Sequence, residues 1–158
     1  MSAAFRIWVD ADATPGEIKE IILRASRRLQ VETILVANKN VATGEGGLVS
    51  LVRVDAGPDL ADAYIVENSA PADFCITADI PLAARLVEKG LTVIDPRGEL
   101  YSAESIGERL AIRDFMAGLR ASGVQTGGPA PFGPRAKQRF AALFDRLLTA
   151  AVRQRVEG

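Results

Sequence analysis

Short apolar runs alternate with amphipathic helical stretches along this chain, and few folds are compatible with that alternation. Five runs, at residues 5–9, 33–37, 48–54, 74–77 and 91–94, have the length and composition of strands. Strands that alternate with helices form a mostly parallel sheet that is covered on both faces. The sequence therefore predicts an α/β fold, a three-layer α/β/α sandwich with a mostly parallel sheet of four or five strands.

The predicted helices cover residues 15–29, 59–68, 80–89, 104–121 and 135–152. Thr14 has the position of an N-cap, and Glu17 would complete a capping box with it. Asp79 and Ser102 have the position of N-caps for two later helices. The helix over 104–121 is expected to bury one apolar face. The residues of that face are Ile106, Leu110, Phe115, Met116 and Leu119.

The length of 158 residues favours one α/β domain, which we place at residues 1–126. Residues 127–134 (GGPAPFGP) are too rich in glycine and proline for regular structure and predict an ordered arm or a linker. Residues 135–158 predict a last helix that packs on the domain or on a second subunit, so a homodimer is one expected assembly. Phe132, Phe140 and Phe144 are the expected anchors of this segment.

The chain has no histidine and a single cysteine, Cys75. Histidine-based nucleophilic catalysis and histidine or cysteine zinc sites are therefore excluded. Cys75 lies inside an apolar run and is predicted to be a small buried residue. Any catalysis has to use carboxylates, hydroxyls, lysine, arginine or a hard metal ion.

Five aspartates lie where predicted strands end or where the following helix begins. Asp10 and Asp12 follow the first strand, Asp79 follows the strand at 74–77, and Asp59 and Asp62 share one face of the helix between them. Ligands of such sheets bind outside the carboxyl ends of the strands. We therefore expect these five carboxylates to converge at one edge.

Converging carboxylates repel one another, and a hard divalent cation relieves that repulsion. The five aspartates thus predict a site for Mg²⁺ or Mn²⁺, with Asp10, Asp62 and Asp79 as the catalytic members. Each acid also has a structural alternative. Asp59 and Asp79 are good helix caps, and Asp12 could accept hydrogen bonds from turn amides.

Three residues at the same predicted edge are assigned to substrate binding. Asn38 follows the strand at 33–37, and Thr77 ends the strand at 74–77. Arg97 follows the strand at 91–94, from where it could reach a phosphate or pair with a nearby acid.

The charge is uneven, because residues 1–100 are net acidic and residues 101–158 are net basic. Basic side chains along the last helix predict either a solvated face or a contact with nucleic acid, so RNA is an expected partner. No apolar run is long enough to span a membrane, and the first residues do not form a signal peptide. We expect a cytoplasmic protein without a membrane partner.

Several segments together resemble the bacterial YaiI/YqxD family. They are IWVDADATP (7–15), ILVAN (34–38), ITADIPLAA (76–84), PRGELY (96–101) and RDFMAGLRASGVQTGGP (113–129). The likeness covers nearly the whole chain. This family is similar to the PIN-like nucleases, which use clustered acids and Mg²⁺ or Mn²⁺ to cut phosphodiesters, usually in RNA.

The resemblance implies roles for individual residues. The acid that closes the first strand of PIN-like proteins matches Asp10, the helical acid matches Asp62, and the acid of the T-x-D turn matches Asp79. Asp12 and Asp59 are additional acids of this branch. A further helical acid of PIN-like proteins, between the first strand and Asp62, has no counterpart here.

Two other functions stay open at this point. Residues 10–14 (DADAT) fit the D-x-D-x-T signature of haloacid-dehalogenase-type phosphatases, in which Asp10 would be a covalent nucleophile. Against that reading, ILVAN lacks the serine or threonine of the second phosphatase motif, and Thr14 is explained as a helix cap. The other alternative is a non-catalytic module that binds RNA or protein.

Overall fold

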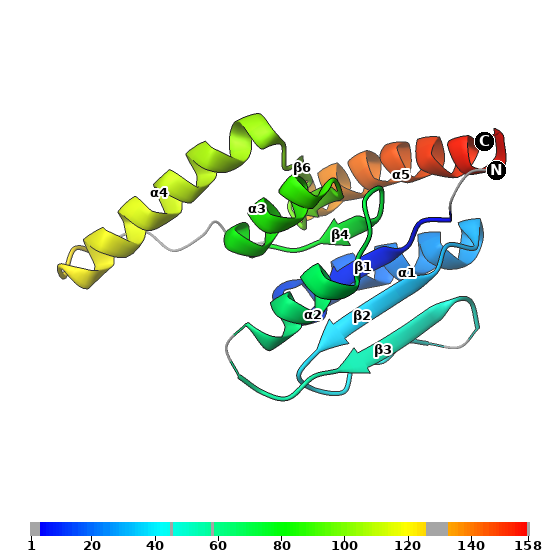
Figure 1. Ribbon diagram of the computed structural model, residues 1–158, viewed down its shortest axis with the longest axis horizontal. Helices are drawn as coiled ribbons and strands as arrows, with labels where there is room; N and C mark the ends of the chain where they lie inside the picture. Colours follow the sequence, from blue (N-terminus) through cyan, green and yellow to red (C-terminus); the bar gives the residue numbers. More distant parts are fainter. Residues whose placement is uncertain (1–3, 45, 58, 126–132, 158) are drawn as a thin grey trace.

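The computed structural model describes residues 4–44, 46–57, 59–125 and 133–157. Six strands form one sheet in the order β3-β2-β1-β4-β5-β6 (Figure 1). All neighbouring strands pair in parallel except β5 and β6. The strands are β1 (Ile7–Asp10), β2 (Thr33–Ala37), β3 (Val49–Arg53), β4 (Phe74–Ile76), β5 (Thr92–Asp95) and β6 (Glu99–Leu100).

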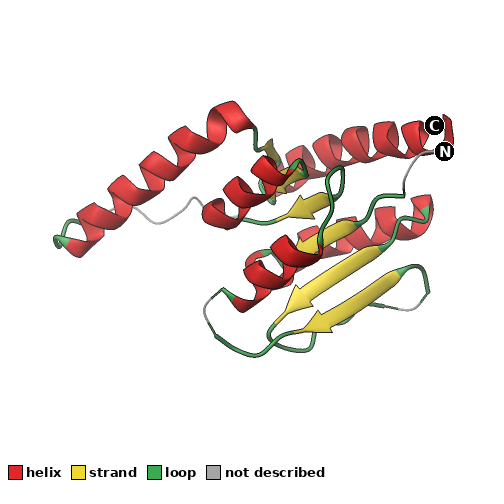
Figure 2. Ribbon diagram, in the orientation of Figure 1, coloured by secondary structure: helices red, strands yellow, loops and turns green. Residues whose placement is uncertain are grey.

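Helices cover both faces of the sheet, which confirms the predicted three-layer α/β/α fold (Figure 2). One face packs against α1 (Gly16–Leu29) and α5 (Pro134–Glu157). The other face packs against α2 (Leu60–Asn68), α3 (Ile80–Lys89) and the start of α4 (Ala103–Ala121).

Strand β1 shows why both faces are apolar. Ile7 and Val9 are buried in the core beneath α1 and α5, whereas Trp8 is buried in the core beneath α2 and α3. Successive side chains of a strand point to opposite faces, so a central strand with two covered faces needs an uninterrupted apolar run.

The last helix is part of the same core. Phe140 and Phe144 of α5 are stacked with ring centroids 5.3 Å apart, and Phe144 meets Phe74 of β4 edge to face at 6.5 Å. Both α5 phenylalanines are almost completely buried. Of the three expected anchors, Phe132 lies outside the described residues.

The sheet has one strand more than predicted. A turn at residues 96–98 reverses the chain after β5, and the two residues of β6 then pair antiparallel to β5. Gly98 has a φ of 89°, and a Cβ atom there would lie 2.6 Å from the Phe140 amide nitrogen. A two-residue strand carries too little pattern to be recognised in the sequence.

Two expectations about helices were wrong. Thr14 does not cap α1: the helix starts after Pro15, and the Thr14 hydroxyl instead donates to the Asp10 carbonyl at 2.8 Å. A short 3-10 turn, Ala11–Ala13, lies between β1 and α1, and after this turn the Thr14 side chain faces the end of β1. The apolar side of α4 is not buried along its whole length, since Phe115 is 65% exposed.

No helix among the described residues is both long enough and apolar enough to cross a membrane.

Candidate active site

The order of the strands creates a switch point between β1 and β4. The chain runs from β1 outward to β2 and β3, then returns to β4 on the other side of β1. The connections from the two central strands therefore diverge and leave a crevice at their carboxyl ends, where doubly wound sheets bind ligands. Asp10 ends β1, and Asp79 follows β4 by three residues.

A hollow of about 220 Å³ lies at this edge. All five predicted aspartates line it: Asp10, Asp12, Asp59, Asp62 and Asp79. They come from the end of β1 and the turn after it, the start of α2, and the turn after β4. The fold thus brings together acids that are up to 69 positions apart in the sequence.

Asp10 is held rigidly at the base of this hollow. It is 4% exposed, and its Oδ2 accepts a hydrogen bond from the Thr77 hydroxyl at 2.7 Å. The Thr77 oxygen in turn accepts the Asp79 amide at 2.9 Å. Burial raises the pKa of Asp10, the Thr77 hydrogen bond lowers it, and the charges of Asp79 and Asp12 raise it further.

Asp79 has two roles in the structure. Its Oδ1 accepts the Leu82 amide at 3.0 Å, so the expected N-cap of α3 is present. Its carboxylate also accepts a hydrogen bond from Asp62 on α2. The cap and the acid cluster therefore share one side chain.

Asp62 has the strongest electrostatic perturbation in the hollow. Burial, the charges of Asp79 and Asp10, and the hydrogen bond to Asp79 raise its pKa to about 7, with a smaller contribution from Asp59. A pKa near 7 leaves Asp62 partly protonated at neutral pH. The neighbouring carboxylates bring negative charge into a small volume, and a cation would relieve it.

The outer acids are arranged differently. The exposed Asp12 accepts the backbone amide of Asn38 at 2.8 Å, which ties the end of β2 to the turn after β1. Asp59 occupies the N-cap position of α2 with a φ of 63°, but its side chain caps nothing. The capping alternative therefore does not explain Asp59.

The three residues assigned to substrate binding lie in three different places. Asn38 lines the acid hollow. Thr77 is completely buried beneath it, with its hydroxyl bonded on both sides, so it positions Asp10 and Asp79 and cannot touch a substrate. Arg97 lies in an adjoining hollow of about 310 Å³, which shares Asp12 and Ala13 with the first.

Asp55 also lines the acid hollow, and the sequence reasoning missed it. It lies two residues beyond β3, whose carboxyl end is at the same edge of the sheet. The rule that selected Asp10 and Asp79 would also have selected Asp55.

The donor set suits a hard divalent cation in its chemistry, because it offers carboxylate oxygens without nitrogen or sulfur ligands. In the described part of the chain, however, no three acidic, cysteine or histidine side chains are placed so that they could hold an ion as they stand. Binding would require some of the carboxylates to turn towards a common point.

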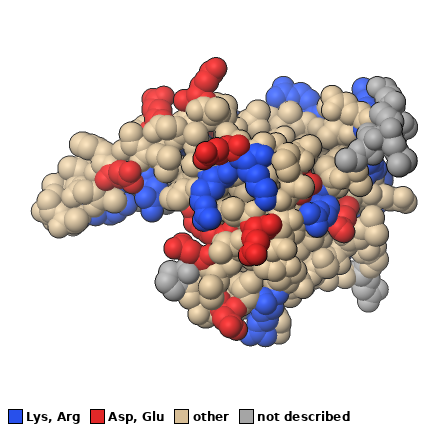
Figure 3. Space-filling model, in the orientation of Figure 1, with Lys and Arg blue, Asp and Glu red and all other residues tan. Residues whose placement is uncertain are grey.

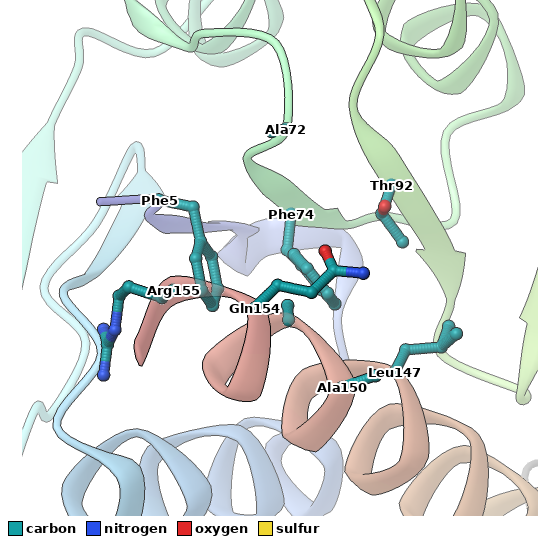
Figure 4. Close-up of a pocket in the computed structure, with 9 residues that line it drawn as sticks. Phe5, Ala72, Phe74, Thr92, Leu147, Ala150, Gln154 and Arg155 are labelled. Atoms are coloured by element: carbon teal, nitrogen blue, oxygen red, sulfur yellow. The ribbon is translucent and has the colours of Figure 1, made fainter. Parts of the chain in front are cut away.

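Other hollows lack this chemistry. The one in Figure 4, of about 350 Å³, lies between α5 and the amino ends of the strands, at the opposite edge of the sheet. Phe5 and Phe74 form its apolar wall, with ring centroids 5.4 Å apart. Figure 3 shows acidic and basic side chains interspersed over the face that carries α2 and α3. Among the described hollows, the concentration of carboxylates is particular to the switch point.

The fold and this hollow define the class: a doubly wound α/β protein with an acidic cluster at its switch point. The sequence comparison gives the family. Residues 8–150 match the family described as "Uncharacterized BCR, YaiI/YqxD family", and the chain belongs to it.

Relatives align along nearly their whole length. A "UPF0178 protein" of Trichlorobacter lovleyi is 56% identical over 148 residues, which cover 94% of this chain and 96% of the relative. One from Syntrophobacter fumaroxidans is 55% identical, with 91% and 94% covered, and one from Myxococcus xanthus is 49% identical, with 94% and 97% covered. No solved structure matches the chain.

Proposed function

We propose that this protein hydrolyses phosphodiester bonds, with single-stranded RNA as the substrate, in a reaction that depends on Mg²⁺ or Mn²⁺. One observation supports the proposal above all: five aspartates from three separate connections line one hollow at the switch point of the sheet. The similarity of this family to PIN-like nucleases points to the same chemistry.

Asp10, Asp62 and Asp79 would hold the cation, with Asp12 and Asp59 at its outer side. When bound, such an ion makes water more acidic and stabilises the charge that develops on the departing oxygen. Thr77 keeps Asp10 Oδ2 fixed and leaves the other carboxylate oxygen of Asp10 for the ligand. Burial and then the charges of Asp79 and Asp10 raise the pKa of Asp62, and an entering ion would offset those charges, so that Asp62 would release its proton.

A polymeric substrate fits the shape of the edge. The acid hollow and the Arg97 hollow share Asp12 and Ala13, so together they extend from the end of β3 to the end of β5. A chain laid along them could place one phosphate at the carboxylates and another at Arg97. Guanidinium groups bind phosphate strongly in such positions.

The experiment incubates the purified protein with Mn²⁺ and, in separate reactions, with single-stranded RNA or p-nitrophenyl phosphate. Asp10→Asn and Asp79→Asn are compared with wild type. Asp145→Asn is the matched control, because Asp145 is exposed on α5 and pairs with Arg28 at 2.7 Å. RNA cleavage that needs Mn²⁺, disappears in the first two variants and persists in the control supports the proposal.

Two other results would contradict the proposed nuclease activity and favour a different function. Cleavage of p-nitrophenyl phosphate with an aspartyl-phosphate on Asp10 would identify a phosphatase. One argument against a phosphatase no longer holds, because Thr14 is not a helix cap in the structure. The other argument remains, because Asn38 follows β2 at the position where the phosphatases need serine or threonine. Absence of turnover together with absence of heat on titration with Mn²⁺ would identify a binding module.

A further inference from the structure

Helix α4 leaves the body of the protein. Its first turns lie beside α3, and the rest projects past the sheet on the side where the strands end (Figures 1 and 2). Ile106, in the first turn, is the residue of α4 that is buried in the core. The described part of the chain provides no core for the second half of this helix to join.

The projecting half carries an apolar stripe. Ile112 is 55% exposed and Phe115 is 65% exposed, and Met116 and Leu119 continue the same side of the helix at positions four and seven residues after Ile112. This spacing is that of a helix face that packs against another element. The four residues, 112, 115, 116 and 119, are called the α4 stripe below.

The α4 stripe is not the side that contacts the body. At 100° per residue, Ile106 and Leu110 point roughly opposite to the mean direction of the stripe. The described sheet and helices therefore cannot close over the stripe without unpacking Ile106 from the core.

We propose that the α4 stripe is the contact surface between two copies of this chain, which pack α4 against α4 about a two-fold axis. The stripe is free of charge: between Ala111 and Leu119 the charged residues are Arg113 and Asp114, which pair with each other at 3.1 Å away from the stripe. An uncharged apolar face is complementary to itself, as a two-fold contact requires. Ala111 and Gly118, two small residues, border it and let two helices approach closely.

The available area is sufficient for a dimer. The exposed parts of Ile112, Phe115 and the rest of the stripe offer about 300–400 Å² of apolar surface per copy, given the 150–250 Å² of an aromatic side chain. Two copies with a polar rim would bury roughly 1,000–1,200 Å² in total, the lower limit for a specific interface. Interfaces of this small size are typical of weak, transient complexes, so we expect a reversible dimer with a Kd on the order of micromolar.

Light scattering coupled to size exclusion, over a series of concentrations, tests the proposal on the full chain. Wild type is expected to shift from the 16.8 kDa monomer to twice that mass. Phe115→Glu should raise the dimer Kd by about a hundredfold, because it places unpaired charge in an apolar contact. Ala117→Glu, an exposed site on the opposite side of α4, should leave the Kd unchanged within a factor of two or three, by the usual scatter of surface substitutions.

Cross-linking locates the contact. The native Cys75 is completely buried, so a short bis-maleimide should leave wild type uncoupled. Met116→Cys should form covalent dimers, and Ala117→Cys should not. The proposal is overturned if wild type stays monomeric at about 100 µM, well above the expected Kd, if Phe115→Glu still dimerises like wild type, or if Met116→Cys fails to couple in a dimeric sample.

Discussion

Replacing Asp62 by asparagine should make the protein without metal more stable, and the gain should grow with pH. Ionised Asp62 is disfavoured in the folded state, first because it is partly buried and second because it lies among the charges of Asp79, Asp10 and Asp59. Asparagine keeps the shape and can still donate a hydrogen bond to Asp79. It removes the ionisation that the folded state disfavours.

The sign and size of this stability change follow from the pKa of Asp62. Folding raises the pKa of Asp62 from 3.8 to about 7, so between these values the folded state binds more protons than the unfolded state, and stability falls as pH rises. The full shift would correspond to about 4 kcal/mol above pH 7. Solvent in the open hollow screens the charges, and we expect a remaining gain of about 1–2 kcal/mol for the variant.

Thermal unfolding in EDTA at pH 5 and pH 8 measures this gain. A gain of 1–2 kcal/mol raises the Tm of a chain of this length by about 2–8 °C. The gain should be complete at pH 8 and less than half as large at pH 5, because pH 5 lies only part of the way from 3.8 to about 7. Asp145→Asn, at the exposed pair with Arg28, should show no such dependence on pH. Equal Tm changes for Asp62→Asn at both pH values, or a loss of stability at pH 8, would refute the reasoning.

Three further predictions concern the same region and its support. Mn²⁺ at a hundred times its Kd should stabilise wild type by about 2.7 kcal/mol, and Asp10→Asn should abolish most of that gain in a thermal shift assay with and without EDTA. Thr77→Val should cost about 1–3 kcal/mol in chemical unfolding, because the buried Asp10 loses its hydroxyl donor, whereas Thr77→Ser should restore most of the stability. Gly98→Ala should cost more than about 1 kcal/mol, because a side chain at φ 89° is strained and would meet the Phe140 backbone. An unchanged denaturation midpoint for Gly98→Ala would show that β6 and α5 can separate freely.

The centre of the sheet was predictable because β1, β2 and β4 are apolar and buried on both faces. Residues 33–37 were expected as a strand and form β2, Thr33–Ala37, with every side chain buried. The sixth strand was not predictable, because Glu99 and Leu100 are exposed and form a strand only through pairing with β5. Local pattern reveals elements that carry the core, and tertiary pairing decides the short elements at its edge.

The candidate site was predictable in its location and less so in its details. Asp10 and Asp79 follow strands, and the rule for parallel sheets places both at one edge. Spacing along the chain could not show that Thr77 is sealed beneath the hollow, nor that Asp12 accepts the Asn38 amide. Those contacts depend on how two turns from different strands meet, which the sequence encodes only through the whole fold.

Helix α4 marks the limit of inference from apolar periodicity. The spacing of Ile112, Phe115 and Leu119 indicates that one side of the helix favours burial, but it does not indicate what covers that side. The same pattern in α5 is satisfied within the chain, where Phe140 and Phe144 pack against β4, whereas in α4 the helix carries its stripe away from the sheet. Within the described residues nothing packs over the exposed Ile112 and Phe115, and the uncharged stripe is complementary to a second copy of itself. The helix therefore points to assembly for the same physical reason that α5 points to the core.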